Sequence, residues 1–173
     1  MHSTPLAYLI TIRCYGTWLH GDPRGSMDRQ EHHQYGGPKI GPNKKIIEAE
    51  ESELKHPPFV MTDGQRAIVE RAIREVCDHR GYQLFAVNAR TNHVHAVVAA
   101  GGRPEAVMNA LKAYATRQLR QAGLLATGVR PWSRHGSNPY LWTNEQVARA
   151  SDYVLNGQDE KPFDRDAPRQ HTR

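Results

Sequence analysis

Hydrophobic and polar residues follow one another along the chain in patterns that predict strands and helices in a definite order. The segment Leu6–Arg13 is rich in strand-forming residues and predicts a first strand. Thr62–His79 carries an apolar stripe at helical spacing, and Gly81 lies where such a helix ends. Two strands follow, Gln83–Asn88 and His93–Ala99, and the short polar turn between them indicates a hairpin.

The rest of the pattern adds a helix, a strand and a final helix. Pro104–Gln121 predicts a helix with proline in its first turn, and Pro131–Trp142 contains a fourth strand. A last helix covers Asn144–Asn156 and stops at Gly157. The order β-α-β-β-α-β predicts the α+β class, namely a ferredoxin-like split βαβ fold with an antiparallel sheet, plus a C-terminal helix. Because this fold serves many functions, it does not indicate one by itself.

Two segments lie outside this pattern. Residues 16–58 form a long insertion after the first strand, rich in glycine, proline and polar residues, with one or two helical turns expected in Lys45–Lys55. Loops of this length are usually functional or disordered. Residues 159–173 are charged and contain prolines, so we expect a flexible tail after a single domain over residues 1–158.

Composition and charge narrow the class of protein only a little. Of the 173 residues, 38% are hydrophobic and 24% charged, as in ordinary globular proteins. No apolar run is long enough to span a membrane, we expect no signal peptide, and the two cysteines lack metal-ligand spacing, so we expect a cytoplasmic protein. The net charge of +5 attracts polyanions such as nucleic acids, although many basic proteins never bind them.

The segment Asn92-His93-Val94-His95 is the most informative candidate for chemistry. Residues i and i+2 of a strand share a face, so His93 and His95 present two imidazoles side by side while Val94 points to a core. Such a pair is half of a site for a divalent metal ion. The alternative is two half-exposed histidines on a sheet, which ten histidines in the chain make plausible by chance. Spacing alone leaves both interpretations open.

Four segments in this order resemble a known family, the HUH single-tyrosine transposases of the insertion-sequence type and their REP-associated relatives. They are Tyr8–Leu19, Arg90–His95, Leu111–Ala115 and Asp152–Gln158. The resemblance covers most of the chain, apart from the insertion and the tail. It implies an enzyme that cuts and rejoins single-stranded DNA, with a hairpin in its substrate, through a tyrosine and a histidine-bound metal ion.

Two tyrosines on predicted helices are candidates for the nucleophile. Tyr114 shares the apolar stripe of its helix, which is typical of a packed core residue. Tyr153 lies about 100° or more from the centre of the last helix's apolar stripe. From the residues alone, an ordinary surface tyrosine is the favoured interpretation of Tyr153. Its place after the strand containing Trp142 matches the family's nucleophile, so the resemblance predicts Tyr153 as the catalytic residue.

The resemblance also implies a divalent metal ion, Mg²⁺ or Mn²⁺, bound by His93, His95 and a side-chain amide shortly after the tyrosine. The family's common pattern places glutamine four residues after the tyrosine, but this position is Gly157 here. We therefore expect Gln158 as the third ligand, with Asn156 as the alternative. The implied product is a 5′-phosphotyrosine link and a free 3′-hydroxyl, which can rejoin strands without ATP.

Contacts with DNA are expected from cations, which bind phosphates, and from an aromatic side chain, which stacks on a base. A solvated basic surface is the alternative for any one of these residues. The basic insertion is a further candidate for contact with a DNA hairpin. The family includes dimers in which one subunit's tyrosine serves the other's histidines, so a homodimer is possible. The candidates are Arg117, Arg120, Arg130, Trp132, Arg134 and His135.

Three other functions compete with this interpretation. A histidine-triad hydrolase needs a third alternating histidine, and that position is Val97. A non-catalytic single-stranded nucleic-acid-binding module needs aromatic residues along its strands, but Gln83–Asn88 offers only Phe85. A domesticated relative that nicks host repeats shares the chemistry of a transposase, so the sequence leaves that alternative open.

Overall fold

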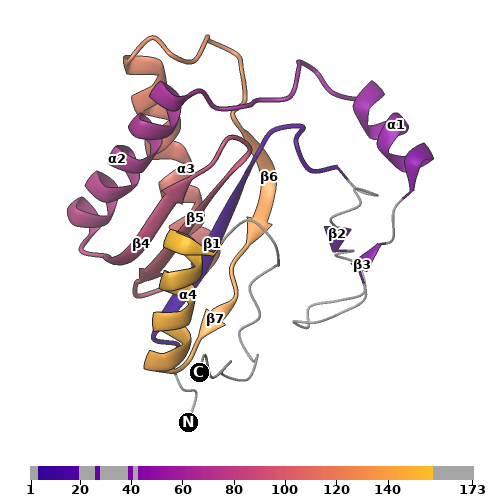
Figure 1. Ribbon diagram of the computed structural model, residues 1–173. Helices are drawn as coiled ribbons and strands as arrows, with labels where there is room; N and C mark the ends of the chain where they lie inside the picture. Colours follow the sequence, from indigo (N-terminus) through magenta and orange to yellow (C-terminus); the bar gives the residue numbers. More distant parts are fainter. Residues whose placement is uncertain (1–3, 20–25, 28–38, 41–42, 158–173) are drawn as a thin grey trace.

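A five-stranded antiparallel sheet organises the computed structural model, which describes residues 4–19, 26–27, 39–40 and 43–157 (Figure 1). The strand order is β4-β5-β1-β6, and β7 pairs with β1 on the same side as β6. This order and the helices between the strands confirm the predicted ferredoxin-like α+β fold. The strands are β1 (Ala7–Cys14), β4 (Gln83–Ala89), β5 (His93–Ala99), β6 (Trp132–Ser137) and β7 (Tyr140–Leu141).

The central strand β1 is buried on both faces. Alternate side chains point to opposite faces, so Ile10 and Ile12 lie on one face of the sheet while Leu9 and Thr11 lie on the other. All four are less than 9% exposed. Burial on both faces explains why this segment is a nearly continuous apolar run instead of an alternating one.

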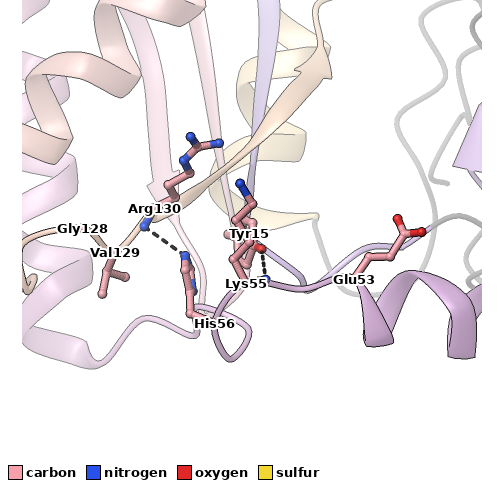
Figure 2. Close-up of a pocket in the computed structure, with 7 residues that line it drawn as sticks. All are labelled: Tyr15, Glu53, Lys55, His56, Gly128, Val129 and Arg130. Carbon is pink, nitrogen blue, oxygen red and sulfur yellow. Dashed lines mark hydrogen bonds between the residues drawn. The ribbon is translucent and has the colours of Figure 1, made fainter.

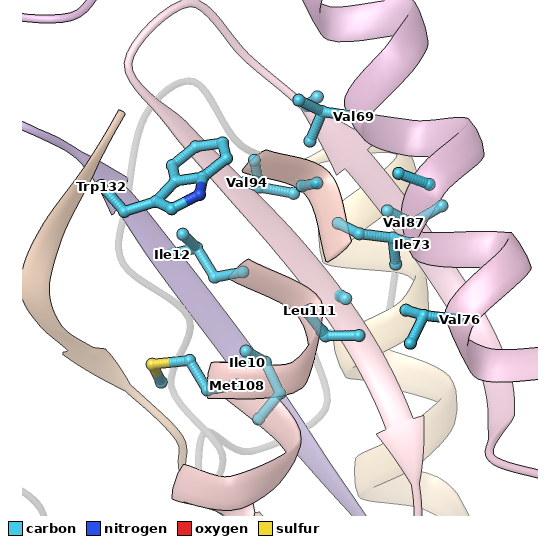
Figure 3. Packing of buried hydrophobic residues seen from close by; sticks show 14 of the residues in the cluster. Ile10, Ile12, Val69, Ile73, Val76, Val87, Val94, Met108, Leu111 and Trp132 are labelled. Atoms are coloured by element: carbon cyan, nitrogen blue, oxygen red, sulfur yellow. The ribbon is translucent and has the colours of Figure 1, made fainter. Parts of the chain in front are cut away.

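Two helices, α2 (Asp63–Arg80) and α3 (Pro104–Gln121), cover one face of the sheet (Figure 1). Helix α2 begins at a capping box made by Thr62 and Gln65 and ends at Gly81, whose φ is 67°. The larger hydrophobic core lies between these helices and the sheet (Figure 3). Its fully buried members include Ile10, Ile12, Ile73, Val94 and Leu111.

A third helix, α4 (Asn144–Asn156), covers the opposite face and encloses a smaller core. Thr143 caps its first turn, because the Thr143 hydroxyl accepts a hydrogen bond from the Gln146 N–H. The smaller core consists of Ala7, Leu9, Ala86, Val97, Leu141, Val147, Ala150 and Val154. Helix α4 is the predicted C-terminal addition to the ferredoxin-like fold.

The described part of the insertion contains two short strands and one helix. Strands β2 (Ser26–Met27) and β3 (Lys39–Ile40) pair with each other, and α1 (Lys44–Ser52) supplies the helical turns expected in Lys45–Lys55. No residue of α1 is buried. Within the described ranges, every helix is too short or too polar to span a lipid bilayer.

Gly136 allows β6 to approach β1 so closely that a side chain has no room there. A Cβ atom at Gly136 would lie 2.2 Å from the Thr11 carbonyl oxygen and 2.8 Å from Met108 Sδ. We expect Gly136→Ala to lower the free energy of unfolding by about 1–3 kcal/mol, measured by urea denaturation, because backbone must move.

Gly101→Ala is the matched control, since a Cβ atom at Gly101 meets nothing within 4 Å. Its free energy of unfolding should change by less than about 0.5 kcal/mol. Equal losses in the two variants would contradict the close approach of β6 to β1.

Candidate active site

His93 and His95 lie side by side on the face of β5 that α4 covers. Their ring centroids are 4.7 Å apart, as strand geometry leads one to expect, and Val94 between them points into the larger core. His95 is buried, with 8% of its surface exposed, whereas His93 is half-buried. The structure therefore presents one shielded imidazole and one that solvent reaches.

A hydrogen bond holds the Nδ1 atom of each histidine. Thr11 lies directly opposite His95 in the β1–β5 ladder, and its Oγ1 is 2.9 Å from His95 Nδ1. The Oδ1 of Asn92 is 2.6 Å from His93 Nδ1. Because Nδ1 is engaged in both rings, a metal ion at this pair would bind Nε2. The sequence analysis did not identify Thr11, although its alternation with Leu9 on β1 places it on the same face.

The surroundings of His95 keep its imidazole neutral. Burial is the largest cause that lowers the pKa of His95 to about 3, and the nearby His93, Arg13 and Arg90 act in the same direction because positive charges disfavour a further one. Neutral imidazole is the form that binds divalent metal ions. Because Mg²⁺ prefers oxygen ligands, two imidazoles fit Mn²⁺ at least as well as Mg²⁺.

Helix α4 brings Tyr153 against the histidine pair. The Tyr153 ring centroid is 5.5 Å from that of His95, with the rings inclined at 60°. Tyr153 is half-buried at the border of the smaller core, next to the buried stripe of Val147, Ala150 and Val154. Tyr153 thus lies beside the buried stripe of α4, as expected, but its ring faces the sheet and not open solvent.

Asn88 ties the end of α4 to this part of the sheet. Asn88 lies opposite His95 in the β4–β5 ladder, and its Nδ2 donates to the Val154 carbonyl oxygen at 3.1 Å. This hydrogen bond fixes the turn of α4 that carries Tyr153. The sequence analysis missed Asn88. The available signal was its polar side chain on a strand face whose other residues are apolar.

Tyr114, the other candidate nucleophile, lies on the opposite side of the sheet. It belongs to α3, packs against the larger core, and has the Arg117 guanidinium 4.4 Å above its ring centroid. The sheet therefore separates Tyr114 from His93 and His95.

Gln158 and Asn156 are the two side-chain amides expected as the third metal ligand. Gln158 lies outside the described residues. Asn156, its alternative, donates from Nδ2 to the Asp152 carboxylate at 2.8 Å on the exposed side of α4. In the described part of the chain, no third histidine, cysteine, aspartate or glutamate joins the histidine pair.

The residues expected to contact DNA differ in their exposure to solvent. Arg117, Arg120, Arg130, Arg134 and His135 are all exposed. Trp132, by contrast, is only 8% exposed, and its Nε1–H donates to the Lys112 carbonyl at 3.2 Å and to Thr116 Oγ1 at 3.0 Å. Figure 3 shows its ring within the larger core. The expectation that Trp132 stacks on a DNA base is therefore corrected, because its ring is used for packing.

The sequence matches the family described as "Transposase IS200 like" over residues 55–145, just over half of the chain. The chain therefore belongs to the IS200-like transposases, as its resemblance to the HUH single-tyrosine transposases implied. Proteins of this family process DNA, so the chain is a DNA-processing enzyme. The matched region contains both histidines and ends before Tyr153.

Two solved structures are similar to this one. A REP-associated tyrosine transposase bound to a REP hairpin has 10% sequence identity and a TM-score of 0.45, over 89% of this chain and 67% of that chain. A putative transposase from Deinococcus radiodurans has 12% identity and a TM-score of 0.44, over 90% and 93% of the two chains. A search of curated proteins found no match.

The lowered pKa of His95 predicts a loss of stability in acid. The unfolded chain takes up a proton at His95 as the pH falls through 6.5, whereas the folded chain does so only near 3. The contribution of neutral His95 to the free energy of unfolding is therefore complete above pH 6.5, and it decreases as the pH falls below that value. In metal-free buffer, lowering the pH from about 7.5 to about 5 should reduce the free energy of unfolding by about 2 kcal/mol through this group.

The variant His95→Gln isolates this contribution from those of other titrating groups. Urea denaturation at both pH values should show a decrease smaller by about 2 kcal/mol in the variant than in the parent protein. The same decrease in both proteins would show that His95 is not buried in its neutral form.

Proposed function

We propose that this transposase cleaves and rejoins single-stranded DNA, with Tyr153 as the nucleophile and His93 and His95 as ligands of a divalent metal ion. The observation that carries the proposal is the contact of Tyr153 with His95, whose ring is in turn beside that of His93. A tyrosine hydroxyl next to two adjacent histidines, one of them kept neutral by burial, has the composition that covalent phosphodiester chemistry needs. Membership in the IS200-like transposases supplies DNA as the substrate.

In the proposed step, the Tyr153 oxygen attacks the scissile phosphorus and the bond from phosphorus to the 3′-oxygen breaks. The tyrosine hydroxyl loses its proton, and the departing 3′-oxygen takes one up as a free hydroxyl. The phosphate stays on the 5′ end of the downstream strand and links that strand to Tyr153 as a phosphotyrosine ester. Because one phosphoester replaces another, a second 3′-hydroxyl reverses the step and joins strands without ATP.

The described residues have distinct tasks in this scheme. Thr11 and Asn92 orient the imidazoles, burial keeps His95 neutral, and Asn88 holds the turn of α4 beside them. When bound, Mg²⁺ or Mn²⁺ would withdraw charge from the scissile phosphate and stabilise the leaving oxygen. Gln158 is the proposed third ligand, with Asn156 as the alternative.

The substrate is proposed to be single-stranded DNA that carries a hairpin at the ends of the mobilised segment. The hairpin part follows from the resemblance to the REP-associated relatives. Exposed cations can bind phosphates of the DNA, and we propose Arg117, Arg120, Arg130 and Arg134 for this role, together with His135. Tyr153 contacts His95 of its own chain, so we propose catalysis within one chain, and a homodimer in which one subunit's tyrosine serves the other's histidines is the alternative that the resemblance implies.

Replacing the proposed nucleophile should abolish the covalent intermediate without weakening DNA binding. We expect Tyr153→Phe to form no denaturant-resistant protein–DNA adduct with hairpin-bearing oligonucleotides and Mn²⁺, because only the attacking oxygen is removed. Gel electrophoresis under denaturing conditions measures the adduct, and fluorescence anisotropy measures the affinity.

Tyr114→Phe is the matched control and should form the adduct as the parent protein does, since the sheet separates Tyr114 from the histidines. Peptide mass spectrometry should locate the adduct of the parent protein on Tyr153. An adduct on Tyr114, or one that persists in Tyr153→Phe, would contradict the proposed nucleophile.

Removing the histidine pair should remove metal dependence and activity together. We expect the double variant His93→Ala and His95→Ala to bind no Mn²⁺ by calorimetry and to lose strand cleavage. Thr11→Val is a graded test, because it removes only the hydroxyl that orients His95, and it should weaken metal affinity about 10- to 100-fold. Full cleavage by the parent protein in EDTA would show that the reaction needs no metal.

A further inference from the structure

A cavity of about 310 Å³ opens beside the end of β1 (Figure 2). Three segments that are distant in sequence form it: the residue after β1, the connection between α1 and α2, and the loop before β6. A volume of this size is at the lower end of the range of small-molecule sites. The lining residues are Tyr15, Glu53, Lys55, His56, Gly128, Val129 and Arg130.

Two stacked rings form the rigid part of the cavity. The Tyr15 and His56 ring centroids are 4.1 Å apart and the rings are inclined at 32°. The Lys55 backbone N–H donates to the Tyr15 hydroxyl at 2.9 Å, and the Arg130 backbone N–H donates to His56 Nε2 at 3.1 Å. Backbone groups from two segments therefore hold both rings in place, so the aromatic surface is preorganised for a flat ligand.

The charges of the cavity suit one phosphate group. Lys55 and Arg130 each contribute a cation, and among the described residues no carboxylate is paired with either side chain. Glu53 contributes the cavity's carboxylate, which leaves a surplus of one positive charge. A single phosphodiester carries one negative charge, whereas a more highly charged ligand would meet the repulsion of Glu53. An aromatic surface beside a small cationic surplus is the combination that binds single-stranded nucleotides.

The cavity lies beside the active-site end of the sheet. Tyr15 is two residues beyond Arg13, the residue that pairs with His93, and the Cys14 N–H donates to the Asn92 carbonyl at 2.9 Å. Two residues of extended chain span about 7 Å. One or two nucleotides of a strand cover about the same distance.

We propose that this cavity is a subsite for one nucleotide of the DNA strand next to the scissile phosphate. The base stacks on the Tyr15–His56 pair, and its phosphate is bound by Arg130 and Lys55. The inference rests on the proposed function, because the strand must also reach His93. It assigns the loop before β6 and the connection between α1 and α2 to substrate positioning.

Photochemical cross-linking tests where a base lies. The full-length protein is irradiated with a short single-stranded oligonucleotide that contains 5-iodouracil in place of thymine, and the cross-linked peptides are identified by mass spectrometry. We expect cross-links at Tyr15 or His56. Cross-links found only at other residues would overturn the subsite.

Affinity measurements test the two halves of the cavity separately. With the same oligonucleotide, Tyr15→Leu should weaken binding about tenfold by removing the stacking surface, whereas Tyr15→Phe keeps the ring and should bind nearly as the parent protein does. Arg130→Gln should lower the salt dependence of binding, with a slope of log affinity against log salt reduced by about 0.7.

Arg74→Gln, on the exposed surface of α2, is the matched control for loss of one cation and should leave both affinity and slope unchanged. Circular dichroism establishes that each variant is folded. If Tyr15→Leu and Arg130→Gln both behave like Arg74→Gln, the subsite is overturned.

Adduct formation at Tyr153 separates this inference from the proposed reaction. An adduct at Tyr153 together with unchanged affinity in the cavity variants would leave the reaction standing and overturn the subsite. Cross-linking at Tyr15 or His56 without any adduct at Tyr153 would support the subsite and overturn the proposed reaction.

Discussion

The pairing of β1 with β5 is the interaction on which the candidate active site depends. This register places Thr11 opposite His95 and Arg13 opposite His93. Side chains of a strand alternate between faces, so a slip of one residue would turn both histidines toward the larger core. The buried residues Ile12 and Val94 on one face, and Leu9 and Val97 on the other, stabilise the register because a slip would expose them or place polar groups in their positions.

Burial on both faces also sets the chemistry of the site. Helix α4 is held to the sheet by the smaller core and by the hydrogen bond from Asn88 to the carbonyl of Val154. In covering the sheet, α4 removes water from His95, which lowers the pKa of this histidine, and it places Tyr153 against the same ring. The packing of α4 on the sheet therefore both stabilises the fold and keeps His95 in the neutral form that binds a metal ion.

Residues outside the histidine pair show where reasoning from sequence reaches its limit. Tyr114 and Tyr153 both lie on helices, and helical spacing distinguished a core position from one beside the core. Trp132 was expected on the surface because basic residues surround it, but its strand turns the indole toward α3, where Lys112 and Thr116 accept its N–H. The Tyr15–His56 cavity had no sequence signal, because the residues that line it come from three separate segments.

The sequence by itself determined the order of strands and helices, the shared face of His93 and His95, and the family resemblance. These features depend on local periodicity and on residues close together in the chain, which a linear pattern records directly. Only the tertiary structure decided which tyrosine contacts the histidines, which side chains orient them, and that His95 is shielded from water. Those outcomes depend on the packing of β1, β4 and α4 against β5, and such long-range contacts are set by the fit of whole surfaces.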